Sequence, residues 1–241
     1  MLSRIINLPE DLDETNIGEI RSRLREASQD DGCRVILFTG NDNRFCLGMN
    51  LGFLSTEARR GNFESLGGYV ALIQDIRRCP KVTLAVVQGE AIGGGLGIAA
   101  SCDFVLAGER ARFGLPEALF GMFPGTVIPL LFSRCLPDHV KKLALTMKTI
   151  DADEAKHMGL VDQWTKDDQI ERELRIRIKD FSRCHSDSVK AIKSLAGFQH
   201  NATLDRLLEE GMSLLKAHLS RPEVWERLSE YAAHGIAGGE R

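Results

Sequence analysis

Three consecutive glycines and one glutamate are the residues of this chain whose types and spacing could do chemistry. Gly93, Gly94 and Gly95 stand where a helix is expected to begin, and Glu117 follows 24 residues after Gly93. Glycines at a helix N-terminus let a ligand approach main-chain N–H groups, where the helix dipole favours negative charge. A carboxylate near such a site could move protons. Together these residues predict a site that stabilises an enolate and shuttles its proton.

A glycine triplet by itself is more often a turn or a packing contact, so its flanking segments decide the interpretation. The segment 81–88 (KVTLAVVQ) predicts a buried strand, and 92–101 predicts an apolar helix of small residues. A strand, a tight turn and a helix in this order hold main-chain donors at the end of a sheet. Upstream, apolar residues at positions 17, 20, 24 and 27 indicate a further helix.

A second main-chain donor could come from an upstream segment with the same organisation. Residues 35–39 (VILFT) predict a strand, and the turn-rich residues 40–43 follow it. The loop 44–50 (RFCLGMN) comes next and contains a glycine. Two strand ends, each followed by a glycine-containing loop, could therefore face one pocket.

Taken together, these motifs resemble the crotonase (enoyl-CoA hydratase/isomerase) superfamily. The segments that match are 44–50, 80–103, 113–125 and 150–162 (IDADEAKHMGLVD). The resemblance implies an α/β fold, a spiral of ββα units with a C-terminal helical region. It also implies that the thioester oxygen accepts hydrogen bonds from the N–H groups of Met49 and Gly94. The candidate pocket residues beside these are Gly93, Gly95, Gly97 and Glu90.

One expected catalytic carboxylate is absent from the chain. The hydratases of the family use two glutamates, and the matching positions here are Gly97 and Glu117. This difference puts ordinary hydration in doubt, because water must be held and deprotonated while Cα is protonated. A single glutamate suffices to move a proton between carbons, as the double-bond isomerases of the family do. It could also support loss of a β-hydroxyl group if another group assists.

Two longer runs resemble one subgroup, the dehydratases of polyketide β-branching cassettes. They are 113–137 (FGLPEALFGMFPGTVIPLLFSRCLP) and 143–162, together with GGGLG. The resemblance implies dehydration of a 3-hydroxy-3-methylglutaryl group on an acyl carrier protein to 3-methylglutaconyl. Glu117 argues against the decarboxylases of such cassettes, which lack it. The alternatives are an enoyl-thioester isomerase and, in another class, a non-catalytic homologue that binds thioesters or RNA.

The amino-acid composition limits the classes of partner and cofactor that we expect. Lys and Arg number 31 against 34 Asp and Glu, a net charge of −3 that gives no sign of a nucleic-acid or membrane partner. No apolar stretch reaches the roughly 18 residues of a membrane span. Without a signal-peptide pattern or paired cysteines, we expect a cytoplasmic protein with reduced thiols. The histidines show no ligand spacing, so no metal is expected and no cofactor beyond the phosphopantetheine of CoA or acyl carrier protein.

The chain is expected to form one functional domain, with a spiral core over 1–150 and a C-terminal helical region over 151–241. The pattern from Asp151 onward predicts only helices. The resemblance implies that this region forms a homotrimer or hexamer. A subunit contact or ordinary core packing could explain its apolar stripe, which consists of Leu204, Leu207, Leu208, Met212, Leu215 and Leu219.

Overall fold

The fold is built on two sheets, and the chain passes back and forth between them through residues 35–114. The structure, a computed structural model, describes residues 2–41 and 43–234, without the side chains of 197–202. Within these ranges, the larger sheet has five parallel strands in the order β1-β2-β4-β6-β9. They are β1 (Ser3–Asn7), β2 (Val35–Thr39), β4 (Val82–Val87), β6 (Phe104–Gly108) and β9 (Gln163–Thr165). The smaller sheet contains β3 (Arg44–Cys46), β5 (Glu90–Ile92), β7 (Arg112–Gly114) and β8 (Ile150–Asp151).

A unit of two strands and a helical segment repeats through the first half of the chain. In each repeat a strand of the larger sheet is followed by a strand of the smaller sheet. The first repeat is β2-β3 with α2 (Leu51–Arg59) and α3 (Glu64–Arg78), and the second is β4-β5 with α4 (Gly94–Ser101). The third is β6-β7 with the short 3-10 helix η1 (Glu117–Phe120). The predicted spiral of ββα units is confirmed.

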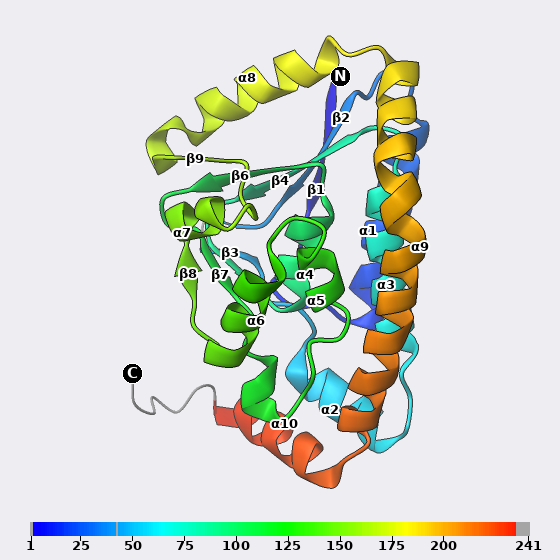
Figure 1. The fold of residues 1–241 in the computed structure, drawn as a ribbon, viewed down its shortest axis with the longest axis vertical. Helices are drawn as coiled ribbons and strands as arrows, with labels where there is room; N and C mark the ends of the chain where they lie inside the picture. The colour runs from blue at the N-terminus through cyan, green and yellow to red at the C-terminus, as the bar shows by residue number, and fades with distance from the viewer. Residues whose placement is uncertain (1, 42, 235–241) are drawn as a thin grey trace.

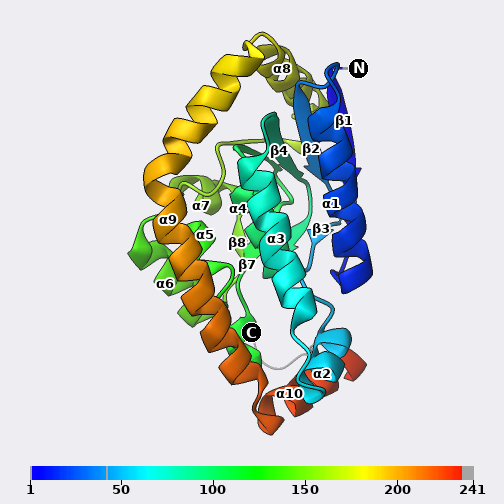
Figure 2. The same ribbon diagram turned by 90° about the vertical axis from the view of Figure 1, so that its right-hand side faces the viewer.

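Both faces of the larger sheet are covered at its central strands, which explains why β2, β4 and β6 are nearly continuous apolar runs. Along β2, Val35 and Leu37 face α8 (Ile170–Ser182), while Ile36 and Phe38 face the main core. Figure 2 shows α3 beside α1 (Glu14–Gln29) on the side of the sheet that faces the main core. Figure 1 shows α8 at the end of the molecule where the N-terminus lies. The α1 residues buried in the core are the four that the sequence predicts, Ile17, Ile20, Leu24 and Ala27.

The prediction that the chain is all helical from Asp151 onward is wrong at β9, which pairs in parallel with β6. A strand of three partly buried residues is too short to show an alternating pattern in the sequence. The remaining helices are α5 (Ile128–Leu131), α6 (Pro137–Thr146), α7 (Ala152–His157), η2 (Asp167–Gln169), α9 (Ser186–Leu219) and α10 (Pro222–His234). None of the helices in the described ranges is long and apolar enough to cross a membrane.

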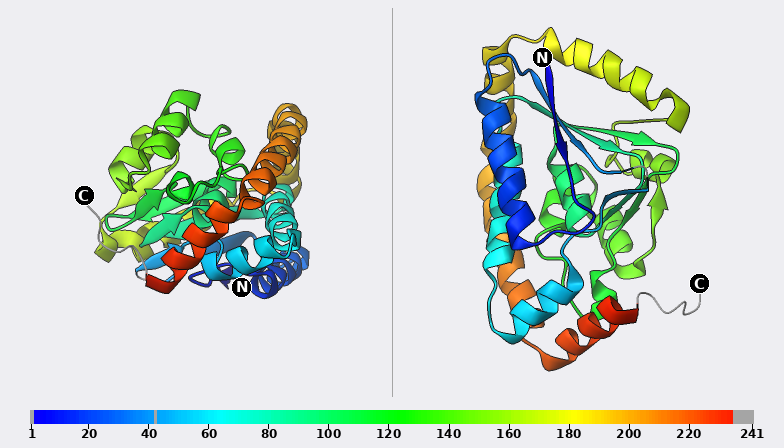
Figure 3. Two further views of the ribbon diagram at one scale, coloured as in Figure 1. Left: turned by 90° about the horizontal axis from the view of Figure 1, so that it is seen from below. Right: turned by 180° about the vertical axis from the view of Figure 1, so that it is seen from behind.

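The C-terminal helices fold back onto their own chain. Helix α9 runs along the molecule beside α3, and α10 crosses under α2 at one end (Figures 1 and 3). Four residues of the predicted apolar stripe, Leu204, Leu208, Leu215 and Leu219, are buried within this chain. Core packing therefore accounts for these four, and the predicted trimer or hexamer stays a prediction.

Two glycines mark where the loop after η1 meets α9. A Cβ atom on Gly125 would lie 2.0 Å from the Gly211 carbonyl oxygen, and one on Gly211 would lie 2.0 Å from the Gly125 oxygen. We expect Gly125→Ala and Gly211→Ala each to lower the free energy of unfolding by at least about 1–3 kcal/mol, because main chain must shift on both sides. Chemical denaturation measures this loss.

The matched control is Gly18→Ala in the middle of α1, where a Cβ atom meets nothing within 4 Å. This variant should be neutral or more stable by about 0.5–1 kcal/mol, because alanine loses less backbone freedom than glycine in a helix. A Gly211→Ala variant as stable as the Gly18→Ala variant would contradict the described contact between α9 and the loop.

Candidate active site

The loop after β3 is held by the segment that precedes α1. The Leu12 N–H donates to the Gly48 oxygen at 2.7 Å, and the Asn50 N–H donates to the Leu12 oxygen at 2.8 Å. These bonds form a parallel bridge between Leu12 and Met49. In such a bridge the N–H group of the middle residue, Met49, points away from Leu12. Among the loop and turn hydrogen bonds of the described residues, the Met49 N–H donates none.

The second candidate donor lies at the first position of α4. Gly93 precedes the helix with φ 52° and ψ −119°, a conformation that favours glycine, and its N–H donates to the Gly114 oxygen at 3.0 Å. The Gly94 N–H belongs to the first turn, where a helix offers no acceptor of its own. It donates none of the loop, turn or cap hydrogen bonds within the described part of the chain.

The two loops pack main chain against main chain. A Cβ atom on Gly48 would lie 2.6 Å from the Gly94 nitrogen, and one on Gly95 would lie 1.9 Å from the Cys46 oxygen. Only glycine permits this approach at either position. Met49 and Gly94, which are far apart in sequence, therefore belong to touching segments, as two donors to one oxygen would require.

The Glu117 carboxylate reaches the same place from a third segment. Glu117 begins η1 directly after Pro116, and a Cβ atom on Gly93 would lie 2.9 Å from its Oε1 atom. Its Oε2 atom is buried and has no hydrogen-bond partner among the described residues. Helix α10 supports η1 from outside, where the Tyr231 ring packs edge-on against Phe120 with ring centres 4.6 Å apart.

Burial governs the protonation of Glu117. The residue is partly exposed as a whole, but the carboxyl end that matters here is enclosed. Loss of hydration raises the pKa of Glu117 from an ordinary 4.5 to about 7, and a hydrogen bond from its own main-chain N–H opposes the rise. A carboxyl group with a pKa near neutrality can both accept and return a proton.

Tyr69 is a site residue that sequence reasoning missed. The space beside Gly97, where the family's hydratases carry a carboxylate, is filled, because a Cβ atom there would lie 2.1 Å from the Tyr69 hydroxyl oxygen. In the sequence Tyr69 falls on the apolar stripe of α3, whose other members are Leu66, Leu72, Ile73 and Ile76. The available signal was that the hydroxyl group of a buried tyrosine needs a partner.

Glu90, the other candidate carboxylate, lies in a different environment. It is exposed at the start of β5 and pairs in register with Arg44 on one side and Arg112 on the other. Its setting is that of a solvated strand residue, whereas the carboxyl end of Glu117 is enclosed. The described residues contain no group of three or more His, Cys, Asp or Glu side chains that could hold a metal ion.

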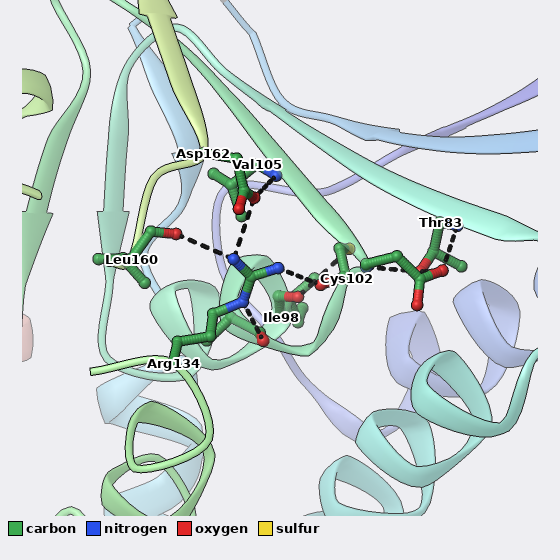
Figure 4. A network of polar contacts seen from close by, with 9 residues as sticks. Thr83, Ile98, Cys102, Val105, Arg134, Leu160 and Asp162 are labelled. Atoms are coloured by element: carbon green, nitrogen blue, oxygen red, sulfur yellow. Dashed lines mark hydrogen bonds and ion pairs between the residues drawn. The ribbon is translucent and has the colours of Figure 1, made fainter. Parts of the chain in front are cut away.

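Arg134 secures the far end of the helix that the glycines begin (Figure 4). Its guanidinium group donates to the carbonyl oxygens of Ala100 and Cys102, at the C-terminal end of α4. It also pairs at 3.0 Å with Asp162, which accepts a hydrogen bond from the Val105 N–H of β6. The Arg134 guanidinium group satisfies carbonyl oxygens that have no partner within the helix, and its positive charge complements the helix dipole. Through Asp162 it also connects α4 to β6 of the larger sheet.

Comparison with known proteins places this arrangement in a family. The family model described as enoyl-CoA hydratase/isomerase matches residues 9–235. A crotonyl-CoA hydratase of Syntrophomonas wolfei is 31% identical over 179 residues, which are 70% of this chain and 67% of the relative. A probable enoyl-CoA hydratase (echA8) of Mycobacterium tuberculosis is 28% identical over 215 residues, 86% of this chain and 80% of the relative.

Solved structures share the fold at lower sequence identity. A polyketide biosynthesis enoyl-CoA hydratase (pksH) of Bacillus subtilis, so described, superposes with a TM-score of 0.87 at 23% identity, covering 97% of this chain and 94% of the other. An enoyl-CoA hydratase of Bacillus halodurans gives 0.84 at 22% identity, with 95% and 96% covered. The family model spans nearly the whole chain, and the protein therefore belongs to the enoyl-CoA hydratase/isomerase family.

Proposed function

We propose that the protein acts on an acyl thioester and stabilises the enolate form of its acyl group. The thioester oxygen accepts hydrogen bonds from the N–H groups of Met49 and Gly94, and Glu117 transfers the proton. Preorganised main-chain donors stabilise the charge that develops on such an oxygen. The observation that carries the proposal is the Oε2 atom of Glu117, which lies enclosed beside the glycines that begin α4 and has no hydrogen-bond partner in the described part of the chain.

A single carboxylate restricts which reactions are open to the enolate. Glu117 removes the Cα proton, and the electron pair passes through the enolate into a new Cα–Cβ double bond as the β-hydroxyl group leaves. The proton held by Glu117 then goes to the departing hydroxide, which becomes water, so atoms and charge balance with one acid–base group. The pKa of about 7 suits a group that accepts and returns the same proton.

The specific reaction that we propose is dehydration of 3-hydroxy-3-methylglutaryl-acyl carrier protein to 3-methylglutaconyl-acyl carrier protein. The runs 113–137 and 143–162 support this subgroup, and so does the pksH structure, which is described as a polyketide biosynthesis protein. The relative from Syntrophomonas wolfei is named for a CoA thioester, so CoA is the other candidate carrier.

Double-bond isomerisation is the second candidate function. One carboxylate with a pKa near 7 can take a proton from one carbon and deliver it to another. The two reactions differ in mass, because dehydration removes one water and isomerisation removes none. Mass spectrometry of the hydroxymethylglutaryl and enoyl thioesters after incubation with the protein distinguishes them.

Replacement of the carboxylate tests the mechanism directly. We expect Glu117→Gln to lower kcat by about 10²–10⁴-fold on the true substrate while the fold is kept, because general acid–base groups contribute factors of this size. Turnover is followed by mass spectrometry of the carrier-bound product. The exposed Glu19 on α1 supplies the control, Glu19→Gln, which should act at the wild-type rate.

Activity of Glu117→Gln within about threefold of wild type would remove Glu117 from the mechanism, since that is far below the usual contribution of an acid–base group. Absence of any thioester turnover by the wild type, on either CoA or acyl carrier protein, would overturn the proposed function itself.

The raised pKa of Glu117 also predicts how stability depends on pH. Below pH 4.5 the carboxyl group is protonated in both the folded and the unfolded states, so it adds no pH dependence. Between 4.5 and 7 the unfolded chain ionises first, and the folded state loses stability as pH rises. Above pH 7 the accumulated loss is about 3 kcal/mol, because each pKa unit corresponds to about 1.36 kcal/mol.

Glu117→Gln removes this ionisation and should therefore stabilise the protein at pH 8, by up to about 3 kcal/mol, but little near pH 5. Denaturant unfolding of both proteins at the two pH values measures the difference. An equal change in stability at pH 5 and pH 8 would show that the folded protein does not hold the carboxyl group in its neutral form.

A further inference from the structure

The hydroxyl group of Tyr69 lies where the side chain of residue 97 would begin. A Cβ atom on Gly97 would be 2.1 Å from this oxygen, and the next neighbours, Leu130 Cδ1 and Tyr69 Cζ, would be 3.3 and 3.4 Å away. The hydroxyl oxygen alone therefore makes the severe contact. Any side chain at position 97, a carboxylate above all, needs the room that this hydroxyl group fills.

The same hydroxyl group is bonded to the glycine that supplies a proposed donor. It donates to the Gly94 carbonyl oxygen at 2.8 Å, and the Tyr69 side chain is buried. Burial, together with the nearby Cys46 and Glu117, keeps the pKa of Tyr69 well above its ordinary value, so the group remains a donor. Glycines restrict the backbone little, and this bond limits the rotation of Gly94 at the start of α4.

We propose that Tyr69 is a positioning residue that also keeps the site to a single carboxylate. Its hydroxyl group holds the Gly94 end of α4 in place and occupies the space that a second carboxylate at residue 97 requires. The inference rests on the proposed function and deepens it. A site closed in this way keeps one acid–base group, Glu117, and has no room for a second carboxylate beside it.

A double-mutant cycle tests whether the Tyr69 hydroxyl group fills the space beside Gly97, and it needs no assay of activity. In the wild type, Gly97→Ala should lower Tm, because the new methyl group meets the hydroxyl oxygen. In a Tyr69→Phe background the nearest remaining contact is Leu130 Cδ1 at 3.3 Å, which is tight but far less severe than the hydroxyl contact, so Gly97→Ala should lower Tm much less. Gly18→Ala, in open space on α1, should give the same small change in both backgrounds. If Gly97→Ala lowered Tm equally in the two backgrounds, the Tyr69 hydroxyl group would not be what fills the space beside Gly97, and this part of the proposal would be wrong.

Kinetics test the positioning role. Tyr69→Phe should lower kcat about tenfold or more while KM stays within about twofold, because small displacements of an oxyanion donor weaken transition-state contacts most. Tyr231→Phe is the matched control, since the same atom is lost from the other tyrosine of the chain while the ring contact with Phe120 is kept. A purely structural role for Tyr69 would lower Tm and leave kcat of the folded protein unchanged.

A ligand that forms an enolate without turnover gives an independent signal. Acetoacetyl-CoA has an acidic Cα proton, and its bound enolate is followed by ultraviolet absorbance. Tyr69→Phe should bind this thioester yet show less enolate than the wild type or Tyr231→Phe. If the wild type is active, Glu117→Gln is inactive and Tyr69→Phe equals wild type in kcat and enolate signal, the inference about Tyr69 is wrong. If the wild type turns over no thioester, the proposed function fails and the inference with it.

Discussion

The close approach of two main-chain segments, the loop after β3 and the start of α4, is the constraint on which the rest of this site depends. Gly48 faces the Gly94 nitrogen and Gly95 faces the Cys46 oxygen at distances that leave no room for a Cβ atom. Neighbouring strands of the smaller sheet, β3 and β5, deliver the two segments to this contact. The site is therefore made of backbone from two repeats of the spiral, and its geometry follows from the pairing of their strands.

A buried carboxylate without a partner is costly, and the surrounding structure shows how Glu117 is kept there. The short helix η1 that begins at Glu117 is too small to be stable by itself, and α10 packs against it through Tyr231 and Phe120. The ionic form of the carboxylate loses hydration, so the fold gives up stability above neutral pH in return for a group that titrates near 7. Residues near the C-terminal end of the described chain thus support the short helix that carries the Glu117 carboxyl group.

Helix α4 is restrained at both ends. These contacts hold the backbone of its glycines in place, although glycine itself restricts the backbone little. At its C-terminal end Arg134 binds open carbonyls and joins them through Asp162 to β6. At its N-terminal end the Tyr69 hydroxyl group binds the Gly94 carbonyl. A helix of eight residues held in this manner can present N–H groups in a fixed direction, the condition for preorganised charge stabilisation.

The sequence by itself determined the strands β2 and β4, the helix α4 and the buried face of α1, because short-range apolar periodicity and glycine placement report local structure directly. Glu117 stood out through its place after the glycine triplet, whereas the missing carboxylate at Gly97 was recognised only through the resemblance to the family. Only the tertiary structure decided that Tyr69 fills the space at Gly97, that β9 joins the larger sheet and that the α9 stripe packs inside its own chain. A tyrosine on an apolar helix stripe gives the same pattern wherever its hydroxyl group ends, because that position depends on how separate elements pack, which no local pattern encodes.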